Sequence, residues 1–207
     1  MTNKFSTKNL VLMGLLTAVL LVMCYTPLGY LNIGVLAITL NTIPVAIAAY
    51  ALGPVGGGVI GGVFGLTSFL QCFGISKMGT AIFAINPALT VFQCFVPRIL
   101  DGLLIGFIAN FLKKQKMPAP AGGAIVGFCA AFFNTLFYMT SLILLFGNSS
   151  YVHKLRSSVA PGRNVLVFVV LLVGVNALVE WFTTAVVTGA VSTALNKARL
   201  VDKPAQA

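Results

Sequence analysis

The chain has 207 residues, of which 58% are hydrophobic and only 8% are charged. Because a soluble domain carries about 25% charged residues, this composition excludes an ordinary soluble protein and indicates an integral membrane protein with room for six spans of about 20 residues. The net charge of +10 does not indicate a nucleic-acid-binding protein, since the charges fall in predicted loops, where they set topology and face anionic lipid.

The first apolar run predicts a membrane helix over about residues 9–24, which follows Lys4 and Lys8. It has no A-x-A cleavage site, so we expect it to be retained as a helix. Gly14 and Ala18 lie four residues apart and form a small-residue face, which favours close packing either inside the chain or with a partner subunit.

Residues 25–41 predict a structured loop, because turn-forming residues precede a short, partly alternating, β-branched stretch. A helix over about 42–52 follows, and Gly53-Pro54 ends it. The next helix, over about 55–70, carries Gly57 and Gly61 four residues apart. Such a row indicates a close helix contact, either internal or with another subunit.

Residues 71–87 predict a second irregular stretch with partly helical pieces. Three long helices are expected after it, over about 88–113, 121–146 and 165–197. A polar loop over 147–164 separates the last two, and 198–207 is expected to be a solvated tail. The fold class is therefore an all-α integral membrane protein, a single transmembrane domain with six transmembrane helices and outward loops after the first and third helices.

Arg98 is the residue around which the functional hypothesis is built. A charge inside an apolar span is costly and usually faces a bundle interior or a watery cavity. A planar guanidinium binds a carboxylate through two parallel hydrogen bonds, so Arg98 is a candidate anchor for an anionic solute. Asp101 lies three residues later, so an internal pair that only locks helices together stays open as an alternative.

Polar residues in the later helices are expected to line the same cavity. Asn134 lies in the middle of the predicted 121–146 helix, where a buried amide needs partners. Asn176 and Glu180 share a helix face, and the role of Glu180 stays open.

The lysine and arginine count predicts the orientation. Eight lie on one side of six spans, namely Lys4, Lys8, Lys113, Lys114, Lys116, Lys197, Arg199 and Lys203, and four lie on the other, namely Lys77, Lys154, Arg156 and Arg163. Both termini are therefore expected in the cytoplasm and the irregular loops outside, with the chain in the cell membrane.

Catalytic and metal chemistry is not expected. Arg98, Asp101, Asn134 and Glu180 form no recognisable catalytic set, and the chain contains no Walker A pattern, so any ATP hydrolysis must come from other chains. The cysteines Cys24, Cys72, Cys94 and Cys129 are scattered singly among apolar residues, and His153 stands alone. We expect no metal site and no cofactor.

Several sequence blocks resemble the substrate-binding S components of energy-coupling factor (ECF) vitamin transporters, most closely the pantothenate type. The blocks are Thr26-Pro27-Leu28-Gly29 leading to Ile33-Gly34, Thr42-Ile43-Pro44-Val45, Leu52-Gly53-Pro54, Val63-Phe64-Gly65-Leu66-Thr67-Ser68 and Phe95-Val96-Pro97-Arg98-Ile99-Leu100. They run from the predicted first helix to the fourth, about half of the chain, and length and hydropathy match over nearly all of it.

The resemblance implies a six-helix S-component fold that captures a vitamin outside, topples in the bilayer and releases it inside on a scaffold driven by ATP. The partners would be one transmembrane scaffold subunit and two ABC ATPase subunits. Arg98 would hold the pantothenate carboxylate, and Asn134 would also bind the substrate. Asn86, Asn41 and Asn176 are further candidate substrate-binding residues. Gly14, Ala18, Gly57 and Gly61 are the candidate partner-interface residues.

Two alternatives to this function stay open. The same fold could bind riboflavin or another small solute, or the chain could be a structural membrane subunit that binds none. An intramembrane enzyme is disfavoured, because the polar residues show no acid, base and nucleophile arrangement.

Overall fold

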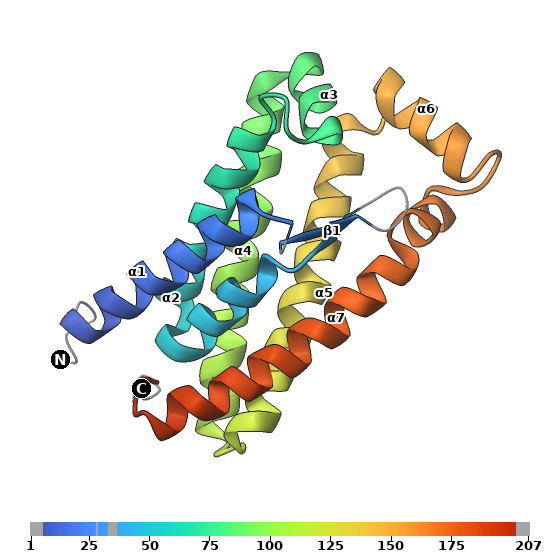
Figure 1. The fold of residues 1–207 in the computed structure, drawn as a ribbon. Helices are drawn as coiled ribbons and strands as arrows, with labels where there is room; N and C mark the ends of the chain where they lie inside the picture. The colour runs from blue at the N-terminus through green and yellow to red at the C-terminus, as the bar shows by residue number, and fades with distance from the viewer. Residues whose placement is uncertain (1–5, 28, 33–36, 202–207) are drawn as a thin grey trace.

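The computed structural model describes residues 6–27, 29–32 and 37–201 (Figure 1). Residues 33–36, Lys4, Lys203 and most of the predicted tail lie outside the described residues. In chain order the elements are α1 (Thr7–Tyr25), β1 (Tyr30–Asn32), β2 (Ala37–Thr39), α2 (Thr42–Gln71), α3 (Lys77–Ile85), α4 (Pro87–Lys114), α5 (Ala119–Phe146), α6 (Ser150–Val159) and α7 (Val165–Lys197). The predicted helical membrane fold is confirmed at this level, with one short hairpin added.

Among the described residues, five helices are long and apolar enough to cross a membrane. They are Thr7–Tyr25, Thr42–Gln71, Pro87–Lys114, Ala119–Phe146 and Asn176–Lys197, and Val165–Gly174 is a shorter apolar helix. The chain is therefore a multi-pass membrane protein, and the count of six spans stays a prediction.

Helix α2 reverses direction at Gly53, as the Gly53-Pro54 pair predicts. Gly53 has φ 71° and ψ −158°, a backbone conformation that glycine adopts without strain. A Cβ atom built on Gly57 would lie 2.9 Å from the Ala49 Cβ, so the two arms of α2 lie against each other. Figure 1 shows the chain turning back at this point.

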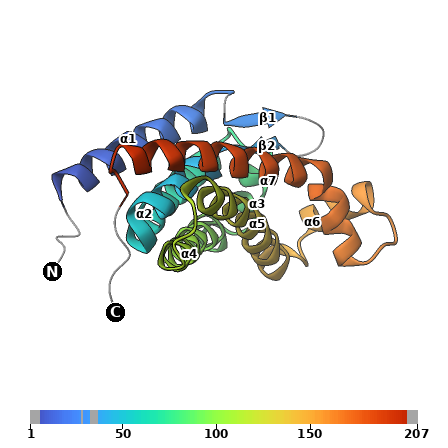
Figure 2. The same ribbon diagram turned by 90° about the horizontal axis from the view of Figure 1, so that it is seen from below.

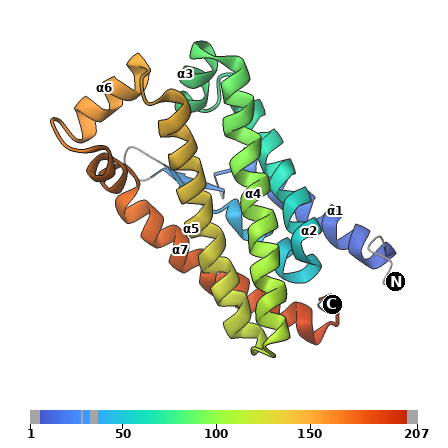
Figure 3. The same ribbon diagram turned by 180° about the vertical axis from the view of Figure 1, so that it is seen from behind.

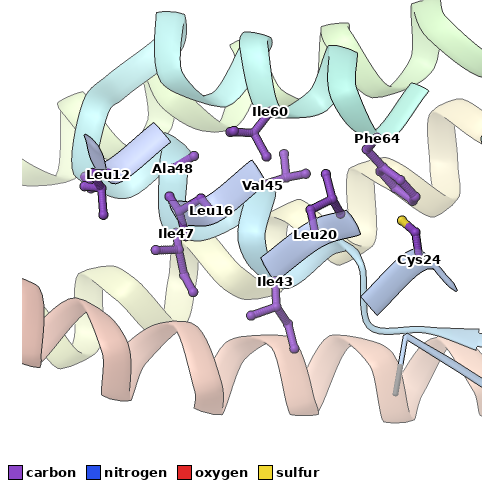
Figure 4. Packing of buried hydrophobic residues seen from close by; sticks show 11 residues of the cluster. Leu12, Leu16, Leu20, Cys24, Ile43, Val45, Ile47, Ala48, Ile60 and Phe64 are labelled. Carbon is purple, nitrogen blue, oxygen red and sulfur yellow. The ribbon is translucent and has the colours of Figure 1, made fainter. Parts of the chain in front are cut away.

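Helix α1 packs on α2 through a narrow seam. Leu12, Leu16, Leu20 and Cys24 recur every four residues and are buried, because this spacing puts them on one helix face (Figure 4). They contact Ile60 and other apolar side chains of α2. The opposite face of α1 is exposed, as is expected of a helix at the edge of a membrane bundle.

The remaining helices pack in sequence around α2. Helix α2 packs against α4, α4 against α5, and α5 against α7 (Figure 3). Seen from below, α1, the hairpin and α7 form one side of the molecule, and α4 and α5 form the other (Figure 2). The hairpin pairs Tyr30 with Thr39, and β2 lies against α7.

The glycines of α2 are used inside the chain, which corrects one of the predicted partner contacts. A Cβ atom on Gly57 would lie 2.2 Å from the Gly102 carbonyl oxygen, and one on Gly61 would lie 2.3 Å from the Arg98 carbonyl oxygen. Gly57 and Gly61 therefore bring α2 and α4 into backbone contact, and they present no surface to another subunit.

Different segments form the two ends of the molecule. Helices α3 and α6 lie at one end, and the turn between α4 and α5 lies at the other (Figures 1 and 3). The expected polar loop over 147–164 contains helix α6, capped by the Ser149 hydroxyl and anchored by buried Val152. At the far end, Lys8 Nζ donates to the Arg199 carbonyl oxygen at 2.5 Å, so the start of α1 adjoins the end of α7.

Candidate functional site

Arg98 is buried in the bundle, with only 8% of its surface exposed. Its guanidinium lies over two aromatic rings, 4.7 Å from the Tyr138 centroid on α5 and 5.1 Å from the Phe64 centroid on α2. Nη1 donates to the Gln93 carbonyl oxygen at 2.9 Å. Both rings attract the cation through their π faces, so they fix the plane of the guanidinium without neutralising its charge.

Asp101 does not pair with Arg98, although the sequence spacing allows it. No Arg98–Asp101 ion pair forms among the described residues, because the guanidinium turns toward Gln93 and the rings. Asp101 is 2% exposed, and its Oδ1 atom has no hydrogen-bond partner in the described part of the chain. The alternative in which the two residues only lock helices together as a pair is therefore not what the structure shows.

Glu180 on α7 connects this helix to the end of the hairpin. The Thr42 hydroxyl donates to Glu180 Oε1 at 3.4 Å, and the backbone amide of Thr39 donates to the same carboxyl group. The Thr42 and Thr184 hydroxyls also lie 3.4 Å apart. Glu180 also interacts electrostatically with Asp101, so the two acidic side chains belong to one buried polar region.

The predicted asparagines occupy different environments. Asn41 is fully buried at the start of α2, and neither its Oδ1 nor its Nδ2 atom has a hydrogen-bond partner in the described structure. Asn134 is half-buried on α5, one turn before Tyr138. An unpaired buried amide is costly, so Asn41 is the asparagine with the strongest physical reason to receive a polar ligand.

Asn86 and Asn176 differ from Asn41 in their surroundings. Asn86 caps α4, because its Oδ1 accepts from the Leu89 amide at 3.1 Å. Its oxygen is therefore already used by the helix terminus. Asn176 is half-buried on α7, two residues after the helix is broken at Gly174 and one turn before Glu180.

Gly14 and Ala18 lie together on the exposed face of α1. A Cβ atom built on Gly14 would meet nothing within 4 Å, in contrast to Gly57 and Gly61. These two small residues are therefore open to contact from another molecule.

The residues that hold Arg98 in place were not predicted from the sequence. Phe64 and Tyr138 come from two helices far apart in sequence, and Gln93 contributes only a backbone carbonyl. The i, i+4 spacing of Asn134 and Tyr138 puts both on one face of α5, which could have indicated Tyr138. Thr42 lies in one of the sequence blocks that resemble the family. Its contact with Glu180 joins residues 138 positions apart, so no local pattern predicts it.

The cysteines are free thiols in the structure, and Cys72 Sγ and Cys94 Sγ lie 3.9 Å apart between α2 and α4. Among the described residues, no group of three or more His, Cys, Asp or Glu side chains could hold a metal ion. The chemistry of the site is that of polar recognition by one cation, two carboxyl groups and several amides.

Comparisons with known proteins identify the family of the chain. Residues 8–192 match the family model described as "ECF transporter, substrate-specific component". The chain is 30% identical over 197 residues to the pantothenate transporter PanT of Leuconostoc mesenteroides subsp. mesenteroides, a match that covers 91% of this chain and 92% of that protein. It is 28% identical over 170 residues to the pantothenic acid transporter PanT of Lactococcus lactis subsp. cremoris, covering 78% and 79% of the two chains. The chain therefore belongs to the family of substrate-specific components of ECF transporters.

Proposed function

We propose that this chain is the pantothenate-binding subunit of an ECF-type importer, with Arg98 as the anchor for the solute carboxylate. The observation that carries the proposal is the position of Arg98: a buried guanidinium held by two aromatic rings, with no acidic partner among the described residues. The names of the two relatives, both pantothenate transporters, support the choice of solute.

The chemistry of pantothenate fits the polar groups around Arg98. Its carboxylate suits the guanidinium, and its amide and hydroxyl groups suit asparagine side chains. Arg98 Nε is buried and has no hydrogen-bond partner in the described structure, so at least one donor remains for a ligand. Asn41 and Asn134 are the amides we assign to the polar part of the solute, and Asn86 and Asn176 are assigned more peripheral contacts.

The orientation follows from the positions of the charges. Lys77, Lys154 and Arg156 belong to α3 and α6 at one end, and Lys113 and Lys114 lie near the turn at the other. The positive-inside rule places the end with the greater number of charges, and with it both termini, in the cytoplasm of a cell whose plasma membrane holds the chain. The solute is then captured from outside and binds on the cytoplasmic side of the hairpin and α3.

Uphill import requires partner chains that hydrolyse ATP. The proposed partners are a transmembrane scaffold subunit and two ABC ATPase subunits, and the exposed Gly14 and Ala18 face of α1 is the proposed contact with the scaffold. Small residues let two membrane helices approach closely, which suits a contact that forms and separates during a transport cycle.

The experiment that tests the proposal is equilibrium binding of labelled pantothenate to the purified chain in nanodiscs. We expect saturable binding by the wild type and a loss of affinity of at least roughly 30-fold in Arg98→Ala, because removing one member of a buried charge pair costs ~2 kcal/mol or more. Lys114→Ala, which removes an exposed charge at the other end of α4, should bind like the wild type.

The outcomes separate the alternatives. If the folded wild type does not bind pantothenate, the solute assignment is wrong, and a panel of vitamins including riboflavin would identify another solute or indicate a structural subunit. If Arg98→Ala binds as well as Lys114→Ala, pantothenate is bound but Arg98 is not its anchor.

A further inference from the structure

The described structure buries three charged side chains, and their charges do not balance. Arg98 is 8% exposed, Asp101 2% and Glu180 7%. Two acidic groups therefore accompany one basic group inside the bundle. A buried net charge is strongly unfavourable in a medium of low dielectric constant, so one of the two carboxyl groups is expected to hold a proton in the solute-free protein.

The three groups act on one another although they form no close ion pair. Asp101 interacts electrostatically with Glu180 and with Arg98, and it also acts on the Cys129 thiol of α5. Arg98 and Asp101 both lie on α4, and Glu180 lies on α7. Among the described residues, α2 and β2 contribute the neutral hydroxyl of Thr42 and the backbone amide of Thr39 to Glu180. The other titratable groups that act on Arg98 are the thiols of Cys24, Cys72 and Cys94 and the Tyr138 hydroxyl.

The surroundings of Asp101 favour protonation of the Asp101–Glu180 pair once Arg98 binds the solute carboxylate. Its Oδ1 atom has no hydrogen-bond donor in the described structure, and such an oxygen is far less costly on a neutral acid than on a carboxylate. Arg98 is the only positive side chain among these groups, so it alone offsets a negative charge on either acid.

Binding of an anionic solute changes this balance. Before binding, Arg98 offsets one ionised carboxyl group of the pair. After binding, Arg98 offsets the carboxylate of the solute instead, and both acidic side chains are left without a cation. The same burial cost then favours protonation of the remaining carboxylate, which takes one proton from solvent and returns it when the solute leaves.

We propose that Asp101 and Glu180 form a proton-binding site linked to the solute site, so that capture of an anionic solute at Arg98 takes up about one proton. The inference rests on the proposed function, because it requires an anionic solute at Arg98. The proton is assigned to the pair as a unit, since interacting carboxyl groups within one buried region titrate together.

The linkage has a defined sign. Since the complex holds more protons than the free chain, the affinity for pantothenate falls as pH rises, by up to about tenfold per pH unit. A solute already ionised at neutral pH contributes nothing to this change, because its own carboxyl group titrates near pH 4.

The test is calorimetric titration of pantothenate into the purified chain at one pH in phosphate, HEPES and Tris, which differ in ionisation enthalpy. We expect the observed enthalpy to rise with buffer ionisation enthalpy with a slope of about one proton taken up. The slope should vanish in the isosteric double variant Asp101→Asn with Glu180→Gln. It should remain in His153→Gln, which removes a titratable group from exposed α6.

A slope of zero with a measurable heat of binding would overturn the inference and leave the proposed function standing. Uptake that persists in the double variant would also overturn it, because the proton would then bind elsewhere. If the double variant does not bind pantothenate, the slope measured for the wild type across the three buffers alone decides whether a proton is taken up. Absence of binding by the wild type would contradict the proposed function itself, so the two failures are distinguishable.

Discussion

At the scale of single residues, Arg98 is positioned by neutral groups. The rings of Phe64 and Tyr138 and the carbonyl of Gln93 surround the guanidinium, while Asp101 lies beyond hydrogen-bonding range of it. An arginine held in a close ion pair by a fixed carboxylate would have to break that contact before binding an anion. The direct contacts of Arg98 are aromatic rings and a carbonyl oxygen, and Asp101 acts on it only electrostatically, so no close ion pair has to break when an anionic solute binds.

Tyr138 is a positioning residue in this account, and its substitution tests the aromatic contact. We expect Tyr138→Leu to weaken pantothenate binding roughly 2- to 30-fold, because a cation–π contact is worth about 0.5–2 kcal/mol. Tyr138→Phe keeps the ring and should bind nearly as well as the wild type. Equal loss in both variants would point to the hydroxyl group, which contacts Met78 Sδ, and would contradict the aromatic role.

Sequence alone could predict that Arg98 is buried and functional, but not the direction in which it points. The i, i+3 spacing with Asp101 is compatible with pairing, and the competing partners come from α2 and α5. Likewise, Asn41 and Asn86 are candidate binding residues because both lie near predicted loops. Only the structure shows that Asn41 is buried without hydrogen-bond partners among the described residues and that Asn86 caps a helix. These differences depend on tertiary contacts, which local periodicity does not contain.

At the scale of helices, the contact between α2 and α4 fixes the position of Arg98 along the bundle. Gly61 lies directly against the Arg98 backbone, and Gly57 lies against Gly102 one turn further along α4. No side chain separates the two helices at these points. The position of Arg98 in the bundle therefore depends on Gly57 and Gly61 of a neighbouring helix.

Two adjacent glycines of α2 give a matched test of this contact. In Gly61→Ala the added Cβ would lie 2.3 Å from the Arg98 carbonyl oxygen, so the helices must move apart. We expect a loss of about 1–3 kcal/mol in stability, measured by thermal unfolding, together with weaker pantothenate binding.

Gly62→Ala is the control for that substitution, because its nearest contact, Ile99 Cγ1, would lie at an ordinary 3.8 Å. It should keep both stability and affinity. If the two variants unfold and bind alike, the close α2–α4 contact does not position Arg98.

The helices themselves were largely predictable from hydropathy. The expected bounds of α1, α4, α5 and α7 agree with the structure to within two residues, since long apolar runs end at polar caps such as Ser6 and Asn86. Helix α6 was missed, because its polar composition masks an amphipathic pattern in which Val152 and its apolar neighbours face α7. The one local indication of this helix was Ser149, a residue type that commonly caps helix N-termini.

At the scale of the whole molecule, the proposed solute site and the proposed docking face lie on different parts of the fold. The polar site lies inside the bundle between α2, α4, α5 and α7, whereas Gly14 and Ala18 lie on the exposed face of α1, opposite the buried seam that packs on α2 (Figure 4). Docking on another membrane subunit through α1 would therefore leave the solute site intact.

This separation predicts that the α1 face can be altered without loss of solute binding. Ala18→Leu should bind pantothenate normally as an isolated chain but lower uptake by the assembled transporter by roughly tenfold or more, because a larger side chain prevents close helix approach. Ala88→Leu, at an exposed alanine of α4, should affect neither property. Normal uptake by Ala18→Leu would show that the scaffold binds another surface.

The most direct test of Arg98 as the carboxylate anchor removes the proposed ionic contact in two ways, once by changing the solute and once by changing the protein. Binding of pantothenate and of its alcohol analogue, in which the carboxylate is replaced by a hydroxymethyl group, would be measured on the wild type and on Arg98→Ala. The account predicts that the wild type strongly prefers pantothenate and that Arg98→Ala binds both weakly and without preference. A preference for pantothenate that survives in Arg98→Ala would contradict the assignment of Arg98 as the carboxylate anchor.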